Sequence, residues 1–236
     1  MSVNKFTSIL MIVILTITPC FAIKKKQLTK LQQTQHGAMH EIVMVERTPG
    51  GEIIQAGLCT AYAVGSHTLL TAEHCNAADT NDIYVDPISR EAIRSGEIQP
   101  HDIINRQFDQ EDHMLVDIKG VDFKDTVYLG PNVRLPIQGE HTYSWGCPHG
   151  IRDQYREGLV TGSVPFKDLD ANEDIKVTGL LYIVQEAVIG GDSGSAVFSA
   201  VDGKLIGVVT FRIEGGIMMG MFPIMFTGEQ IEAGTK

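Results

Sequence analysis

Three short segments of the chain carry residue types that together catalyse acyl transfer. His74 lies in TAEHC at the end of an apolar stretch, Asp112 opens the apolar segment 114–118, and Ser193 lies in GGDSGS. A serine hydroxyl becomes a strong nucleophile when an imidazole accepts its proton, and a carboxylate can orient that imidazole and stabilise its cation. The order His, Asp, Ser therefore supplies the groups of a hydrolase that works through an acyl intermediate.

Glycines flank the candidate nucleophile on both sides. Gly190 and Gly191 precede it, Gly194 follows it, and the apolar segment 196–198 comes directly after. A glycine-rich turn between two strands can expose the hydroxyl and let backbone N–H groups converge on an oxyanion. Taken singly, a histidine at a strand end or a glycine-rich turn has an ordinary structural explanation, so the prediction depends on the combination.

Asp112 is favoured as the carboxylate of this set. The apolar residues two and four positions later alternate with it on one face of a predicted strand. Asp109 lies further from this apolar run, and Asp117 would fall on the opposite face. The remaining competitor is Asp102.

The segments that must position these residues are predicted to be short β-strands. From His40 onward, apolar runs rich in Val, Ile, Thr and Tyr alternate with Gly, Pro, Asn and Asp, and almost none has a sustained helical period. This pattern favours an all-β barrel or sandwich over alternating strands and helices. The expected strands cover residues 41–46, 58–64, 68–71, 114–118, 143–145, 159–164, 179–184, 196–198, 205–211 and 217–225.

Two further segments organise the chain. Residues 130–139, GPNVRLPIQG, contain two Pro and two Gly and are typical of a linker between two halves. Residues 23–37 are polar and predict an arm or a propeptide, which we prefer to the alternative of a short amphipathic helix.

The N-terminus has the layout of a secretory signal. Lys5 precedes an apolar run at 9–17, and a small-residue site ends at Ala22, so residues 1–22 predict a cleaved signal peptide and a secreted or periplasmic protein. The alternative is a retained membrane anchor over residues 6–23. No stable membrane contact is expected unless this segment is retained.

Charge and cysteine content limit the partners and cofactors. The net charge is −10, and removal of the signal leaves 18 basic and 29 acidic side chains, a net −11. This sign is wrong for neutralising phosphates, so no nucleic acid partner is expected. No Cys or His cluster has metal-ligand spacing, and neither a metal nor a cofactor is expected.

Three cysteines remain after removal of the signal, so an exported chain can form at most one internal disulfide. Cys59 and Cys75, 16 residues apart, are the natural pair. Cys147 would then be a free thiol, and we expect it to act as a small buried hydrophobe and not as a redox site.

The combined motifs resemble those of the chymotrypsin-like serine proteases. TAEHC with the upstream Cys59, D-x-x-L-V at Asp112 and GGDSGS at Ser193 are similar to the three signatures of that family, and the resemblance covers residues 40 to 226. It implies two antiparallel six-stranded β-barrels, here residues 38–129 and 140–236, with the active site in the cleft between them. It also implies a disulfide between the cysteines that flank the histidine loop.

Further matches point to one branch of the family. GCPHG (146–150) followed by GLV (158–160), and GMFPI (220–224), are similar to segments of compact bacterial, phage, viral and Deg-type members. The intervals from His74 to Asp112 (38) and from there to Ser193 (81) imply short loops. We expect no peptide-binding domain after the last strand.

The resemblance assigns roles to the motif residues. It makes His74 the general base, Asp112 its orienting acid and Ser193 the nucleophile, and it places the oxyanion between the N–H groups of Gly191 and Ser193. The substrate is therefore a protein or peptide. The implied primary pocket has Ala187 at its base and walls that include Thr210, Phe211, Arg212, Gly215 and Gly216.

The pocket residues predict cleavage after an uncharged, small or medium apolar residue. Ala187 supplies no counter-charge for a Lys or Arg side chain of the substrate. Arg212 stands where the family usually has Gly, so it either narrows the cleft and attracts an acidic substrate residue or points to solvent.

The sequence shows no cleavage site that would activate the enzyme. Zymogens of the family become active when a new Ile or Val N-terminus pairs with the acid next to the nucleophile, here Asp192, but no R-I-V-G-G-like site precedes the first strand. Either Asp192 has another partner or the enzyme folds in an active form, and we prefer the second.

The alternative function is a catalytically silent binding protein with a protease fold. A lipase-type G-x-S-x-G elbow is not present, because the segment reads GDSGS and no helical pattern follows.

Overall fold

The computed structural model describes residues 28–76, 82–130, 133–168, 177, 179–213 and 218–234. The expected signal peptide or anchor lies outside the described residues, as do residues 23–27 of the expected arm. Within the described ranges, no helix combines the length and the apolar character that crossing a bilayer requires.

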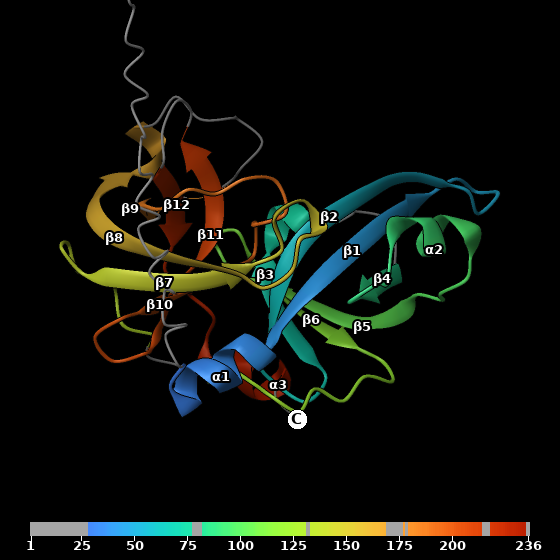
Figure 1. Ribbon diagram of the computed structural model, residues 1–236, viewed down its shortest axis with the longest axis horizontal. Coiled ribbons are helices and arrows are strands. Elements are labelled where there is room, and N and C mark those ends of the chain that lie inside the picture. The colour runs from blue at the N-terminus through green and yellow to red at the C-terminus, as the bar shows by residue number, and fades with distance from the viewer. Residues whose placement is uncertain are drawn as a thin grey trace, which may run out of the picture.

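Two closed antiparallel β-barrels lie side by side and confirm the predicted fold class (Figure 1). The first barrel has the strand order β1-β2-β3-β6-β5-β4, and the second has the order β10-β11-β12-β9-β8-β7. The strands are β1 (Met39–Arg47), β2 (Ile53–Ala63), β3 (Thr68–Ala72), β4 (Asp82–Val85), β5 (His101–Phe108), β6 (His113–Ile118), β7 (His141–Gly146), β8 (Gln154–Pro165), β9 (Leu180–Gln185), β10 (Ala196–Ser199), β11 (Leu205–Ile213) and β12 (Met218–Phe222).

Two of these strands, β4 and β5, were not predicted by the apolar pattern. β4 has only four residues, DIYV, and β5 reads HDIINRQF, in which Ile103 is the single buried residue. A strand with so few buried positions has no period of alternating apolar residues, so its pairing with β6 and β4 gives it its structure.

The hydrophobic core continues from one barrel into the other. Tyr62 of β2 is fully buried, its ring lies 5.7 Å from that of Phe198 in β10, and its hydroxyl donates to the carbonyl of Trp145 at 2.9 Å. Burial raises the pKa of Tyr62 well above its ordinary value. These contacts hold β2 of the first barrel and β10 of the second, which directly follows the Ser193 segment, in a fixed relation.

The N-terminal helix corrects the preference for an unstructured arm. α1 (Lys30–Gly37) begins at Thr29, whose side chain accepts from the N–H of Gln32 while the Gln32 side chain accepts from the N–H of Thr29. This reciprocal cap stabilises a short helix of low apolar content. Gln35 then donates to the carbonyl of Gly203 at 2.7 Å and accepts from the Tyr143 hydroxyl at 2.8 Å, so α1 is held against the second barrel.

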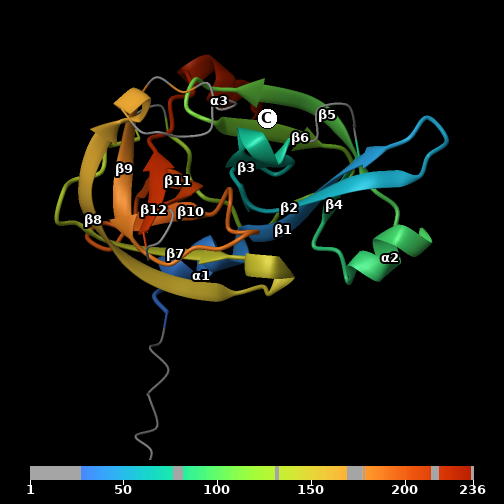
Figure 2. The ribbon, with the colours of Figure 1, turned by 90° about the horizontal axis from the view of Figure 1, so that it is seen from above.

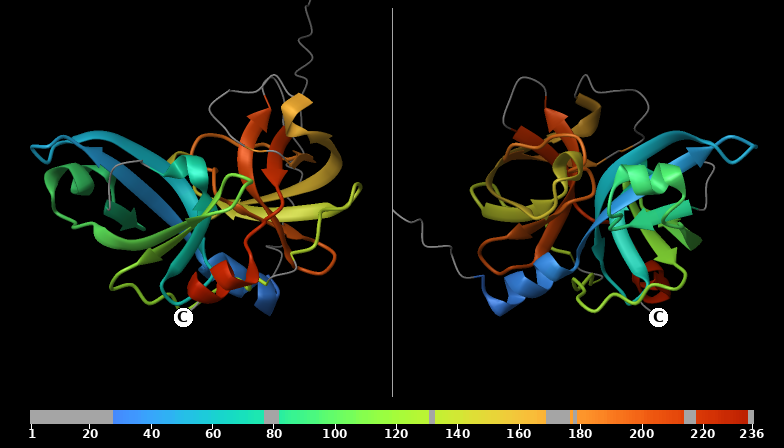
Figure 3. Two further views of the ribbon diagram at one scale, coloured as in Figure 1. Left: turned by 180° about the vertical axis from the view of Figure 1, so that it is seen from behind. Right: turned by 45° about the vertical axis from the view of Figure 1, so that its right-hand side comes forward.

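Two other helices complete the fold. α3 (Gly228–Gly234) returns from the second barrel to the first, where Ile231 is buried and the Gln230 side chain donates to the carbonyl of Phe108 (Figure 3). α2 (Arg90–Ser95) connects β4 to β5 and lies at the outer end of the first barrel, as the view from above shows (Figure 2). Between β6 and β7, the described residues form no helix or strand, and the predicted linker 130–139 falls within this connection.

Candidate active site

His74 and Asp112 form a hydrogen-bonded pair at the junction of the two barrels. His74 lies in the short 3-10 helix η1 (Glu73–Cys75), which follows β3 directly. Its Nδ1 lies 2.8 Å from Oδ2 of Asp112, and its backbone N–H donates to Oδ1 of the same carboxylate at 3.0 Å. An ionised carboxylate on Nδ1 keeps the proton there and leaves Nε2 unprotonated, which is the form of imidazole that accepts a proton.

Asp112 reaches His74 from a turn and not from a strand. β6 begins one residue later at His113, and Asp112 itself has a left-handed backbone with φ 61°. The alternation argument in favour of Asp112 is therefore wrong about the local structure, although the residue does meet the histidine. The carboxylate is 5% exposed, whereas the His74 side chain is 33% exposed, so the pair is buried on the acid side and open on the imidazole side.

The Ser193 segment lies against the strand and disulfide next to His74. The carbonyl of Ser193 accepts from the N–H of Thr60 at 2.8 Å and lies 3.9 Å from Sγ of Cys75, the residue after His74. The hydroxyl of Ser193 makes no hydrogen bond to any described residue, and the residue is partly exposed. The structure thus brings the three sequence motifs to one place, with the serine hydroxyl available.

The N–H groups of Gly191 and Ser193 have fixed directions and no protein partner among the described residues. The carbonyl of Gly190 accepts from the N–H of His149 at 2.8 Å, and the carbonyl of Asp192 accepts from the N–H of Ser195 at 2.9 Å. A planar trans peptide directs its N–H opposite to its carbonyl, so each of these bonds orients the N–H of the next residue. Two oriented free donors next to a serine hydroxyl have the chemistry of an oxyanion site.

Two glycines make this turn possible. Gly191 has φ +100°, and a Cβ there would lie 2.6 Å from the carbonyl oxygen of Cys147. Gly194 has φ +87°, and a Cβ there would lie 2.0 Å from the carbonyl oxygen of Thr60. Both positions exclude any other residue on conformation and on space.

Asp192, beside the nucleophile, pairs with an arginine inside the second barrel. Its carboxylate is 1% exposed and lies 2.5 Å from Nη1 of Arg156 in β8. Nε of Arg156 lies 3.3 Å from the carboxylate of Glu186, which also accepts from the Ser144 hydroxyl at 2.5 Å. Burial raises the pKa of Glu186, although Ser144 and Arg156 oppose that shift. Asp192 therefore has an internal cationic partner.

The cysteines behave as expected. Cys59 and Cys75 form a disulfide, which ties β2 to the helical turn that carries His74. Cys147 is a buried free thiol, and burial raises its pKa to about 12. A thiol in that environment is almost entirely protonated near neutral pH and is a poor nucleophile.

The predicted primary-pocket residues differ in their exposure. Ala187 is exposed in the loop after β9, Thr210 is buried in β11, and Arg212 is exposed at the end of β11. The ring of Phe211 packs against Phe166 at 5.0 Å between ring centres. Gly215 and Gly216 lie outside the described residues.

Two residues that position the site were not singled out from the sequence. Thr60 donates through its hydroxyl to the carbonyl of Gly191 at 2.8 Å and accepts from the N–H of Cys147 at 3.0 Å. Arg156 is the second, and it comes from a strand far from the three motifs. Arg156 lies before the predicted strand 159–164, and a charged residue at such a place is typical of a solvent-facing position, so nothing in the sequence indicated its role.

The comparisons with known proteins agree with this fold. The family model described as "Trypsin-like peptidase domain" matches residues 59–208, more than half of the chain. The chain is similar in fold to the Rv3671c protease from M. tuberculosis in its active form, with a TM-score of 0.59 and 15% sequence identity over 87% of this chain and 82% of that chain. An inactive form of Rv3671c with a serine-to-alanine mutation gives a TM-score of 0.59 and 16% identity over 82% of this chain and 84% of that chain. No curated protein sequence matches the chain at a significant level.

Proposed function

Because the chain belongs to the trypsin-like peptidase family and is a serine peptidase, we propose that it is an exported endopeptidase in which Ser193, His74 and Asp112 form the catalytic triad. The observation that carries this proposal is the contact of Asp112 with Nδ1 of His74, together with the position of the Ser193 backbone against Cys75. His74 Nε2 takes the proton of the Ser193 hydroxyl as the oxygen attacks the peptide carbonyl. It then returns the proton to the leaving amine.

The tetrahedral oxyanion is held by the N–H groups of Gly191 and Ser193. Each donor of this kind contributes about 3 to 4 kcal/mol to stabilisation of the transition state. The support is that carbonyl contacts of Gly190 and Asp192 orient both groups before the substrate arrives. Donors that are already oriented need no reorganisation during the reaction.

The peptidase needs no new N-terminus to become active. The charge that a new amino group would bring to Asp192 is already supplied by Arg156, at 2.5 Å. Removal of that guanidinium would leave a carboxylate buried without a cation, which is costly. Arg156→Met should therefore lower both kcat and the free energy of unfolding. The native protein should be active without cleavage at an activation site.

The specificity proposed is for an uncharged, small or medium apolar residue before the scissile bond. The support is that Ala187, the residue assigned to the base of the pocket, has no carboxylate to pair with a Lys or Arg side chain of the substrate. A peptide-library profile dominated by Lys or Arg would overturn this part of the proposal and would leave the triad unaffected.

A fluorophosphonate probe tests the triad directly. The native protein should label at Ser193, and Ser193→Ala should not label and should lose about 10⁶-fold in kcat. Ser195→Ala is the matched control, because its hydroxyl lies two residues away and is fully buried. Absence of labelling on correctly folded native protein would instead support a silent binding protein. The mass of the mature N-terminus from an expressing cell tests export.

A further inference from the structure

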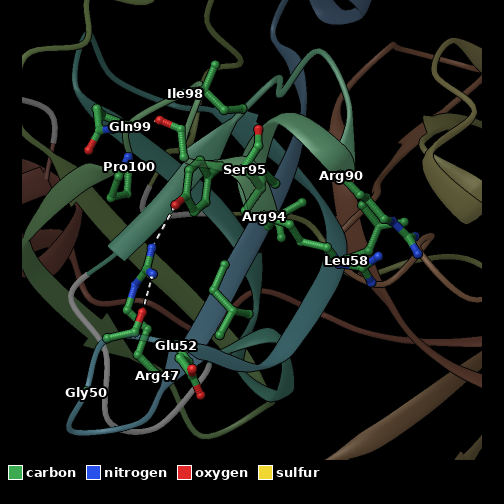
Figure 4. Close-up of a pocket in the computed structure, with 16 residues that line it drawn as sticks. Arg47, Gly50, Glu52, Leu58, Arg90, Arg94, Ser95, Ile98, Gln99 and Pro100 are labelled. Carbon is green, nitrogen blue, oxygen red and sulfur yellow. Dashed lines mark hydrogen bonds between the residues drawn. The ribbon is translucent and has the colours of Figure 1, made fainter.

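A cavity of about 700 Å³ lies in the first barrel, outside the site described above (Figure 4). The β1–β2 hairpin with Arg47, Gly50 and Glu52 lines one side, and α2 with the residues that follow it lines the other. Its floor is apolar and includes Val43 and Ile93, which belong to a separate buried cluster of this barrel. The volume is in the range that binds small ligands or a few residues of a peptide.

The rim of the cavity carries more positive than negative charge. Arg47 is already matched, because its Nε lies 2.8 Å from Asp82 and its Nη2 donates to the Tyr84 hydroxyl at 2.8 Å. Arg90 and Arg94 are exposed and form no ion pair with a described residue, while Glu52 is the acid of the lining. In a chain of net charge −10, this is a local cationic site above an apolar floor.

The spacing of Arg90 and Arg94 lowers the stability of helix α2. They stand four residues apart, on the same face of α2, where like charges repel. Arg90 also occupies the first position of the helix, where the macrodipole disfavours a cation. An acidic or neutral residue in place of Arg90 would therefore suit the helix better, whereas Arg94 lies in the last turn, where a cation is favoured.

The cavity connects to the candidate active site through two lining residues. Leu58 lines the cavity, and its Cδ2 lies 3.3 Å from the position of a Cβ built on Gly191. Arg90 lines the cavity and also a smaller one that includes His149, whose N–H holds the carbonyl of Gly190. The expected primary pocket lies in the second barrel and would hold the residue before the scissile bond. A substrate chain that continues from Gly191 past Leu58 therefore reaches the first barrel with the residues that follow the scissile bond, which form its leaving-group side.

We propose that this cavity binds the leaving-group side of a protein substrate, with an apolar side chain on its floor and acidic residues at Arg90 and Arg94. The proposal rests on the proposed peptidase function, because the direction of the substrate follows from the position of the oxyanion site. Negative substrate segments are otherwise repelled by the acidic chain, so a local arginine pair raises both their affinity and their rate of association.

Two peptides that share one cleavage segment test the site. One ends shortly after the scissile bond, and the other continues with an extension of Asp, Glu, Phe and Leu. The native enzyme should cleave the extended peptide with a kcat/KM about tenfold higher, through a lower KM, and salt should reduce the advantage. Arg90→Glu with Arg94→Glu should remove the advantage and leave cleavage of the short peptide unchanged.

A control and a binding measurement separate this proposal from the peptidase function. Lys119→Glu with Lys204→Glu makes the same charge change outside the cavity lining and should keep the advantage. Binding of the labelled extension alone, measured by anisotropy, should weaken about tenfold in the Arg90→Glu, Arg94→Glu variant.

Three outcomes would change the interpretation. Equal cleavage of both peptides by the native enzyme, with binding of the extension unchanged in the arginine variant, overturns the site and leaves the peptidase. No cleavage of either peptide, with binding lost in the arginine variant, overturns the peptidase and supports the site. A native dimer that the arginine variant dissociates would assign the cavity to a second copy and overturn the proposal.

Discussion

Two histidine–aspartate pairs lie next to each other in the first barrel, and only one of them faces the cleft. His74 Nδ1 meets Oδ2 of Asp112 at 2.8 Å, and His113 Nδ1 meets Oδ2 of Asp109 at 2.7 Å. The first histidine side chain is 33% exposed, and the second is fully buried with an Nε2 that has no partner among the described residues. The bond that orients an imidazole is thus common to both, and access to Nε2 distinguishes the catalytic candidate.

The buried pair supports the exposed one. Asp109 accepts from the backbone N–H groups of Glu111 and His113 and from that of Met225 after the last strand. These bonds fix both ends of the turn that contains Asp112. The comparison teaches that one acid–histidine pair can fix the geometry of a turn while its neighbour keeps an accessible Nε2.

Asp112→Asn should produce the largest effect on catalysis. The amide can no longer hold His74 in the correct tautomer, so kcat should fall about 10⁴-fold while the melting temperature changes little. Steady-state kinetics and thermal unfolding of the variant measure both. Asp102→Asn, at an exposed position, is the control and should leave both values at the native level.

Asp109→Asn should lower stability strongly and kcat weakly. It breaks a fully buried pair and should lower the free energy of unfolding by about 3 kcal/mol. Because His74 and Asp112 keep their own contact, the loss in kcat should be far smaller than that of the first variant. Denaturant unfolding and kinetics on the folded fraction test this. A larger loss of kcat than in Asp112→Asn would contradict the division of roles.

The buried pair should contribute to the pH dependence of stability. Burial raises the pKa of Asp109, but the hydrogen bond and charge of His113 and the backbone donors outweigh it, so the pKa lies below the ordinary value. The contribution is then fully present above the unfolded pKa of about 3.9 and is lost as the pH falls through the lower folded pKa. The stability difference between the native protein and Asp109→Asn should stay constant from neutral pH to about pH 5 and shrink below about pH 4. A difference that grows in acid would reverse the assigned sign.

Diethyl pyrocarbonate should distinguish the two histidines with the smallest perturbation. The reagent needs an accessible unprotonated nitrogen, so His74 should be modified in the folded protein and His113 only after unfolding. Peptide mapping by mass spectrometry measures both sites in one sample. Modification of His113 at the native rate of His74 would show that the second pair is also open to solvent.

Local sequence patterns carried much of this structure. Runs of alternating or continuous apolar residues predicted most of the strands, because burial on one or both faces leaves a trace in residue order. The combination in TAEHC and GGDSGS, and the two cysteines, also predicted where the reactive groups lie in the chain. Strand β5 and helix α1 escaped because one has a single buried residue and the other depends on capping and docking.

The sequence by itself determined which residues are able to do chemistry and the fold class that holds them. Only the tertiary structure decided which histidine nitrogen is accessible, and that Arg156 meets Asp192 and Thr60 meets Gly191. These contacts join strands that are far apart in the chain, and residue spacing carries no information on such distances. Barrel closure and burial set them, because a buried polar group must find its partner wherever the fold places it.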